Sequence, residues 1–337
     1  MKKIIPPVNT SLIENELTED KFLRNTNVGN NSIYIITAHN SPNVMREIGR
    51  LRELTFREAG GGTGKEIDID EYDTAKIPFK QLIVWNNDNK EIVSSYRFIL
   101  GKDVPLDENG YPHTPTSKLF LFSKKFIEGK WQKTIELGRS FVQPKYQGTT
   151  NPRIGLFSLD NLWDGLGTLA VDYPDVHFFL GKMTMYDSYN RLARNLILFF
   201  LRKYFKGDKN LIAPIHPVVV DKRKQVFRSI FNNNSYKEDF RALNDNVRDL
   251  KTSIPPLIKS YMSLSSTMKC FGASANPEFG PVEEIAIIIK IADINEDKKK
   301  RYIYSYKKRE RAEVKIQKAV TKMQKAESRR QKRRKDD

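Results

Sequence analysis

The sequence Glu136-Leu137-Gly138-Arg139-Ser140 places a carboxylate and a guanidinium three residues apart in a segment bounded by Thr134-Ile135 and Phe141-Val142. Burying such charges is costly unless they find partners. We expect a strand from Lys133 to Val142 whose charged side chains meet partners from elsewhere in the chain.

Charged residues within apolar surroundings recur at intervals before this segment. The sites are Arg97 in the run 92–100, Asp68, Asp70 and Asp73 in the run 66–73, and Arg52 with Phe56 in the run 49–56. Several such sites within ninety residues predict one shared cluster of charge. Clusters of this kind mark reaction sites more often than scaffolds.

The order of these residues resembles that of a known enzyme family. Arg-x-x-x-Phe, Asp-x-x-Asp, an arginine on a strand and Glu-x-x-Arg are similar to the acyl-homoserine-lactone synthases and to the ornithine-lipid and glycine-lipid N-acyltransferases (hemolysin-like), all of the GNAT type. Gly138 and Ser140 are closer to the lipid-forming branch, because lactone synthases usually carry Ser or Thr at the first position and an apolar or aromatic residue at the second. The likeness runs from about residue 44 to about residue 294. Further agreement comes from Val142-x-Pro144-x-Tyr146-Gln147, Leu162-Trp163-x-Gly165 and the segment 254–261.

N-acyl transfer needs a neutral amine beside a thioester carbonyl, a proton acceptor and donors for the oxyanion. Glu136 is the candidate base, with a structural pairing to Arg139 or Arg97 as the alternative. Asp70 and Asp73 are candidates to attract the substrate ammonium, and Arg97 and Arg139 either hold a carboxylate or neutralise the acids. The four histidines are scattered without metal-ligand or Ser-His-Asp spacing, so we expect direct attack by the amine and no metal.

The resemblance also indicates a donor side. Arg52 and Phe56 resemble donor-side residues, and a loop from Gln143 to Gly155 precedes a helix expected over 154–166. In the GNAT fold this junction holds the pyrophosphate or phosphopantetheine of the donor at a helix N-terminus. Only Arg153-x-Gly155 remains of the usual glycine motif. The resemblance implies acyl carrier protein as donor, with no bound cofactor, and the donor or substrate contacts expected besides these are Ser140, Lys145 and Trp163.

The basic character of the chain is concentrated at its end. Residues 298–337 hold 18 Lys+Arg and 5 Asp+Glu, a net of +13 out of +17 for the whole chain. This segment is expected to be a helical or disordered tail that contacts an anionic membrane, nucleic acid or an acidic carrier protein, or that only solubilises. No apolar run is long enough to span a bilayer and no signal peptide is evident, so we expect a cytoplasmic protein, with peripheral membrane contact as one alternative. The lone Cys270 is expected to be a packed small residue.

The pattern of elements predicts an α/β (α+β) fold of GNAT type, with a mixed sheet flanked by helices. A helix begins at Pro42 with Ser41 as N-cap and ends in a flexible glycine crossover at 60–64. Strands at 79–85 and 92–100 form a hairpin, and a buried strand at 177–185 and a helix at 187–204 follow. A closing segment at 254–293 ends in a strand at 285–291. We divide the chain into an N-terminal extension (1–40), the acyltransferase domain (41–297) and the basic tail (298–337).

We therefore predict an N-acyltransferase of bacterial aminolipid biosynthesis. It would move a (3-hydroxy) fatty acyl group from acyl carrier protein to the amine of glycine or ornithine, identities that come from the resemblance alone. One alternative is an acyl-homoserine-lactone synthase. The other is a non-catalytic protein that uses its basic tail on RNA or membrane, with nucleic acid the less favoured partner.

Overall fold

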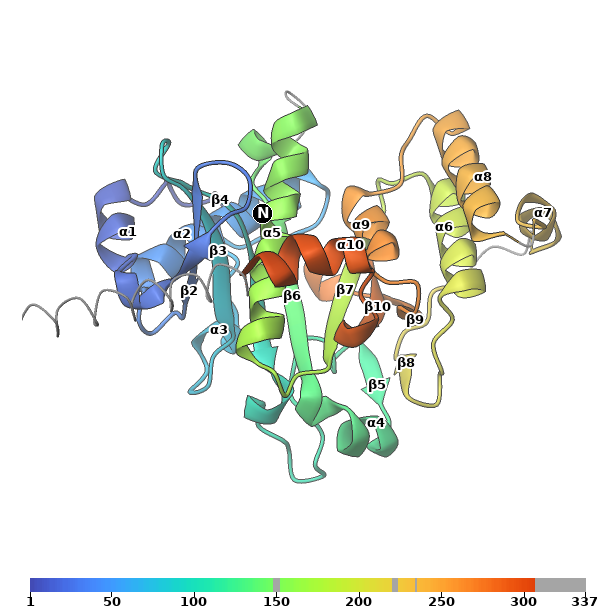
Figure 1. Ribbon diagram of the computed structural model, residues 1–337, viewed down its shortest axis with the longest axis horizontal. Helices are drawn as coiled ribbons and strands as arrows, with labels where there is room; N and C mark the ends of the chain where they lie inside the picture. The colour runs from blue at the N-terminus through green and yellow to red at the C-terminus, as the bar shows by residue number, and fades with distance from the viewer. Residues whose placement is uncertain (148–151, 220–223, 234, 307–337) are drawn as a thin grey trace, which may run out of the picture.

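The protein is described by a computed structural model over residues 1–147, 152–219, 224–233 and 235–306; side chains of 152–156 and 224 are excluded. These residues contain an eight-stranded sheet in the order β1-β2-β3-β4-β6-β7-β10-β9 (Figure 1). All neighbouring strands are antiparallel except β6 and β7, which are parallel. The predicted α/β (α+β) class, a mixed sheet flanked by helices, is confirmed. The strands are β1 (Phe22–Asn25), β2 (Asn31–Ile36), β3 (Lys80–Asn86), β4 (Glu91–Leu100), β6 (Thr134–Val142), β7 (Phe178–Tyr186), β9 (Lys269–Ala275) and β10 (Val282–Lys290), with β5 (Phe120–Phe122) and β8 (Ile212–Pro214) in a separate pair.

Helices cover both faces of the sheet. Successive residues of a strand point to opposite faces; on β3, Leu82 and Val84 pack in one core with α5 and α9, whereas Ile83 and Trp85 pack in another with α1 and α2. The first face also carries α6, α8 and a π-helix. The helices are α1 (Thr10–Glu16), α2 (Pro42–Glu58), α3 (Glu71–Thr74), α4 (Lys124–Gly129), α5 (Pro152–Asp172), α6 (Arg191–Tyr204), α7 (Lys224–Ile230), α8 (Tyr236–Asp249), α9 (Pro256–Leu264), α10 (Glu296–Lys298) and the π-helix (Lys299–Tyr304). None of them is long and apolar enough to cross a membrane.

The predicted β3–β4 hairpin and its turn are confirmed, and the expected strands at 133–142 and 177–185 correspond to β6 and β7. Other boundaries differ. The helix α5 begins before the predicted residue 154 and continues past 166, and α6 begins four residues after the predicted 187 because a turn precedes its N-cap, Asn190.

The start of α2 is as predicted, with Ser41 as N-cap and Pro42 in the first turn, but Ser41 makes no capping hydrogen bond. Glu16 of α1 supplies the cap instead, because its two carboxylate oxygens accept from the amides of Asn43 (3.1 Å) and Val44 (2.8 Å). A carboxylate is favourable there, where the helix dipole is positive. Thus α1 is joined to the body through the helix it caps.

The glycine crossover after α2 was predicted to be flexible, and here the structure corrects the prediction. The carboxylate of Glu53, buried on α2, accepts hydrogen bonds from the amides of Thr63 (3.0 Å) and Gly64 (2.8 Å) and from the Thr63 hydroxyl (2.7 Å). Gly62 has φ +97°, a conformation that side chains disfavour. The loop is therefore held by a buried acid.

Both ends of the described chain join the central layers. Residues 22–36, assigned above to the N-terminal extension, form β1 and β2, and β2 pairs with β3 along its whole length. The first residues of the basic segment form the π-helix, which lies against α5 (Figure 1). Residues 307–337, and with them most of the predicted tail, lie outside the described residues.

The contact between α5 and the π-helix depends on a glycine. A Cβ at Gly167 would lie 2.2 Å from the carbonyl oxygen of Tyr302, a backbone atom that cannot rotate away. We expect Gly167→Ala to lower the free energy of unfolding by about 1–3 kcal/mol, the usual cost of overpacking. Urea denaturation followed by circular dichroism measures the effect. Gly129→Ala on α4 is the matched control, since a Cβ there meets nothing within 4 Å; equal stability of the two variants would contradict the assigned contact.

Two irregularities of β6 shape the centre of the molecule. Its parallel pairing with β7 is limited to Thr134–Glu136 opposite Phe178–Leu180, and beyond these residues the two strands separate. On the other side, the register with β4 shifts between Ser95 and Arg97, and Arg139 takes φ +50° in the left-handed region. Such a bulge redirects the side chains that follow it.

Candidate active site

A pocket lies where β6 and β7 separate. It contains about 940 Å³ of empty space, part of it open to solvent. Because the two strands do not pair here, the pocket passes from one face of the sheet to the other. Glu136 and Lys182 line it on the side of α3, and Leu137 lines it on the side of α5 and α9. The pocket therefore has a charged side and an apolar side.

Behind the charged side lies a buried ion network. Asp73 is fully buried and accepts from Arg52 (2.9 Å) and Gln81 (2.9 Å), and its Oδ2 lies 3.1 Å from a guanidinium nitrogen of Arg97. Arg97 also donates to Asp70 at 2.7 Å. Burial alone would raise the pKa of Asp73, but the Arg52 and Arg97 guanidiniums outweigh it and hold that pKa below its usual range. The network holds Arg97 in one position at the pocket wall.

The bulge brings Arg139 into this cluster. Its Nε lies 2.9 Å from Asp68 Oδ2, and its guanidinium lies over the Phe279 ring, 4.2 Å from the centroid. Burial raises the pKa of Asp68, and the guanidiniums of Arg139 and Arg52 oppose that shift. A left-handed conformation costs a non-glycine residue energy that the surroundings must offset. The ion pair and the ring contact are the interactions that do so.

The two carboxylate oxygens of Glu136 differ, because one accepts hydrogen bonds and the other accepts none from the described residues. Its Oε1 accepts from the amide (3.1 Å) and the hydroxyl (2.6 Å) of Thr116, whereas the buried Oε2 has no partner among the described residues. Lys182 on β7 donates to the same hydroxyl at 2.7 Å. Thr116 thus accepts from the lysine and donates to the carboxylate, which leaves Oε2 of Glu136 as an acceptor in the pocket.

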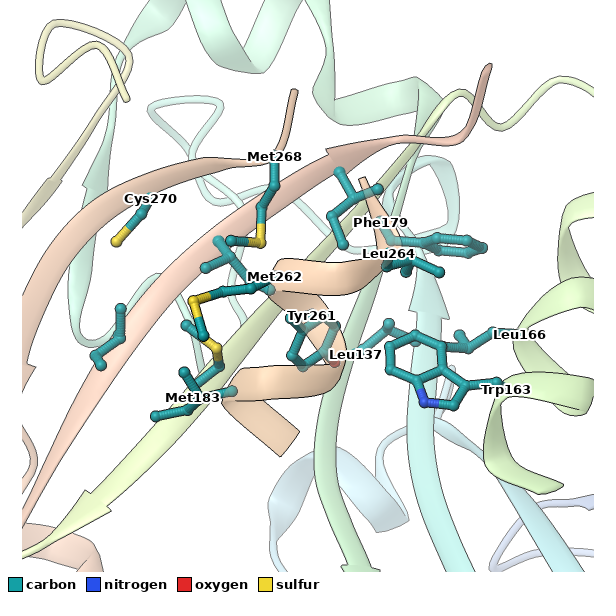
Figure 2. Close-up of a cluster of buried hydrophobic side chains, with 14 of the residues drawn as sticks. Leu137, Trp163, Leu166, Phe179, Met183, Tyr261, Met262, Leu264, Met268 and Cys270 are labelled. Atoms are coloured by element: carbon teal, nitrogen blue, oxygen red, sulfur yellow. The ribbon is translucent and has the colours of Figure 1, made fainter. Parts of the chain in front are cut away.

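The apolar side is built by α5 and α9. Figure 2 shows Trp163 and Leu166 of α5 lying beside Tyr261 of α9 and Leu137 of β6. The rings of Trp163 and Tyr261 meet edge to face, with centroids 5.2 Å apart. Cys270 lies buried in the surrounding core, as expected for a packed small residue, and burial raises its pKa to about 11.

The structure brings together part of the predicted set. The predicted residues that line the pocket are Glu136, Arg139, Arg97, Phe56, Ser140 and Trp163. Arg52, Asp70 and Asp73 lie behind the wall and reach the pocket through Arg97, and Asp70 also lies 3.9 Å from a guanidinium nitrogen of Arg139. Lys145 lies away from it, paired with Glu91 at 2.6 Å. Arg153 and Gly155 lie in the first turn of α5, and their side chains are outside the described set.

Several pocket residues were missed by the sequence analysis. Lys182 was read only as part of a buried strand, although a lysine inside the apolar run 177–185 was a usable signal. Glu284 of β10 was a similar signal, and its Oε2 accepts from Thr184 at 3.1 Å. Thr116, which does not line the pocket but bonds to both Glu136 and Lys182, carried no such signal, because it lies in a loop without a distinctive sequence pattern.

Comparison with known proteins assigns the chain to a protein family. A glycine N(alpha)-acyltransferase of Bacteroides thetaiotaomicron is 53% identical over 306 residues, covering 91% of this chain and 91% of that protein. The chain belongs to this family. A second acyltransferase of the same name, from Phocaeicola vulgatus, is 50% identical over 316 residues, covering 94% of this chain and 97% of the relative. A protein-family model described as an acetyltransferase (GNAT) domain matches residues 51–154 of the acyltransferase.

Two solved structures are also similar to the acyltransferase at low identity. FeeM, an N-acyl amino acid synthase from uncultured soil microbes, aligns with a TM-score of 0.39 and 11% identity over 79% of this chain and 93% of its own. BjaI, a CoA-dependent acyl-homoserine lactone synthase, aligns with a TM-score of 0.30 and 13% identity over 62% of this chain and 97% of its own. The prediction of an N-acyltransferase is confirmed by the family assignment.

Proposed function

We propose that the enzyme transfers a (3-hydroxy) fatty acyl group from acyl carrier protein to the amine of glycine, in bacterial aminolipid biosynthesis. The observation that carries this proposal is the pocket itself, which joins an apolar side to a charged side across the sheet. A fatty acyl chain fits between α5 and α9 by the hydrophobic effect. A small polar acceptor fits beside Glu136. Glycine is preferred to ornithine because both relatives are named for glycine.

The residues support a direct transfer. Glu136 Oε2 takes a proton from the substrate ammonium, and the resulting amine attacks the thioester carbonyl. A C–N bond forms and the C–S bond breaks, and the proton lost from the attacking nitrogen goes to the leaving sulfur, so phosphopantetheine is released as its thiol. Arg97 and Arg139 line the pocket and supply positive potential where negative charge develops on the carbonyl oxygen.

The direct test uses the purified full-length protein. It is incubated with 3-hydroxyacyl and unsubstituted acyl carrier protein, or with the matching acyl-CoA, and with glycine or ornithine. Mass spectrometry then reads both the acyl chain and the amine from the product. We expect N-acylglycine from the carrier protein. Product from ornithine alone, or equal rates with acyl-CoA and acyl carrier protein, would contradict the corresponding part of the proposal.

The donor assignment makes a second prediction. A carrier protein is acidic, so attraction to Lys145 and Arg153 near the start of α5 would weaken as salt rises. We expect kcat/KM with acyl carrier protein to fall with ionic strength, and the double variant Lys145→Glu, Arg153→Glu to raise KM for the carrier. The double variant Lys124→Glu, Lys125→Glu on α4, remote from α5's start in Figure 1, is the charge-matched control, because both lysines are exposed. An equal rise in KM for both would show a non-specific charge effect.

Membrane contact through 298–337 remains a prediction.

A further inference from the structure

The positive charges of the pocket differ in how they are paired. Among the described residues, the cations that line it are Arg97, Arg139 and Lys182. Arg97 is paired with two aspartates and Arg139 with Asp68. In these partly or fully buried pairs each guanidinium already has a carboxylate counter-ion, although the Nε of both arginines makes no hydrogen bond among the described residues. Neither arginine is therefore free to serve as the main partner of a substrate carboxylate.

Lys182 is different. Its ammonium donates to the neutral hydroxyl of Thr116, and no carboxylate of the described residues lies within ion-pair distance of it. Burial lowers its pKa, while the Glu136 and Glu284 carboxylates nearby act in the opposite direction. Lys182 is partly buried, and a partly desolvated cation with no directly paired counter-ion is costly. An anionic group bound in the pocket would remove that cost.

An unpaired acceptor lies close to this unpaired cation. Glu136 and Lys182 bond to the same hydroxyl of Thr116, so one side chain separates them. Oε2 of Glu136 has no partner, and the lysine has two remaining donor positions. An α-amino acid carries an ammonium and a carboxylate on one carbon. Its two charges match this arrangement, with the ammonium at Glu136 and the carboxylate at Lys182.

We propose that Lys182 binds the α-carboxylate of the acceptor and so selects an amino acid over a simple amine. This inference rests on the proposed function, since it names the part of the acceptor that the same pocket recognises. A different role would be purely structural, with Lys182 only orienting Thr116. The two roles differ in one respect: a structural lysine is indifferent to the charge of the acceptor.

The test compares glycine with glycinamide, in which a neutral amide replaces the carboxylate. The acyl donor is supplied to the enzyme, and kcat and KM for each of the two acceptors are measured for wild type, Lys182→Met and Lys182→Arg. We expect Lys182→Met to raise KM for glycine by roughly 10- to 100-fold, the value of a hydrogen bond to a charged group. KM for glycinamide should change little, and Lys182→Arg should keep much of the preference for glycine. The two acceptors differ in amine pKa, but this difference cancels in the ratio of variant to wild type.

Lys80→Met is the matched control, because Lys80 lies on β3, away from the pocket, and its ammonium also bonds to a neutral hydroxyl, that of Tyr173 at 3.3 Å. It should leave the preference unchanged. If Lys182→Met does not fold, Lys182→Gln gives the same comparison. Equal losses with glycine and glycinamide in the folded variant would overturn the inference and leave the proposed function standing. Failure of wild type to acylate glycine at all would overturn the proposed function itself.

Discussion

Glu136→Gln is expected to lower kcat by roughly 10²–10⁴-fold, the usual contribution of a general base, while the protein remains folded. Glutamine preserves the shape of the side chain and can still accept from Thr116 through its carbonyl oxygen. It cannot take a proton from the ammonium at the position of Oε2, which is buried and unpaired. Steady-state rates of N-acylglycine formation measure the loss.

The matched control is Glu47→Gln. Glu47 is a buried carboxylate on α2 that pairs with Arg50 at 2.5 Å and lies away from the pocket. We expect its kcat to remain near that of wild type, even if stability falls. Product formation at the wild-type rate by a folded Glu136→Gln variant would remove Glu136 from the mechanism. Its role would then be to hold Thr116, and not the pairing with Arg139 or Arg97 considered from the sequence, which the structure does not show.

Asp73→Asn is expected to lower the free energy of unfolding by about 3–5 kcal/mol, the cost of removing one partner from a buried ion pair. Arg52, fully buried, would then have no carboxylate of the described residues within ion-pair distance, and Arg97 would keep only Asp70. Urea denaturation at neutral pH measures the loss. Asp70→Asn is the control: asparagine also serves as an N-cap for α3, and the lost ion pair is more exposed, so about 0–1 kcal/mol is expected.

The same variant has a defined pH dependence. The folded-state pKa of Asp73 lies below its unfolded value, so the folded protein binds fewer protons there. The stability from this charge is present above the unfolded pKa of about 4 and is lost as pH falls toward the folded pKa. The difference in stability between wild type and Asp73→Asn should therefore shrink below about pH 4. A difference that is constant with pH would show that packing, not charge, accounts for the loss.

Much of the local structure could be predicted from the sequence. The β3–β4 hairpin follows from two apolar runs separated by Asn86–Lys90, because turn residues and β-rich runs act within a few residues of each other. The convergence of Arg52, Asp73, Arg97 and Glu136 was also predictable, since charges inside apolar runs must find partners. Periodicity gave no such guide to residues 22–36, whose short strands are stabilised by pairing with β3 and with each other.

The sequence by itself determined the β3–β4 hairpin, the strands β6 and β7, the start of α2 and the need for several charges to be buried together, because those properties depend on local side-chain chemistry and spacing. Only the tertiary structure decided that β6 and β7 separate after Glu136 and that Arg139 takes a left-handed conformation. It also decided that Thr116 and Lys182, far apart in the sequence, meet at Glu136. These features depend on strand register and on contacts between distant segments, and no local pattern encodes the geometry with which such segments meet.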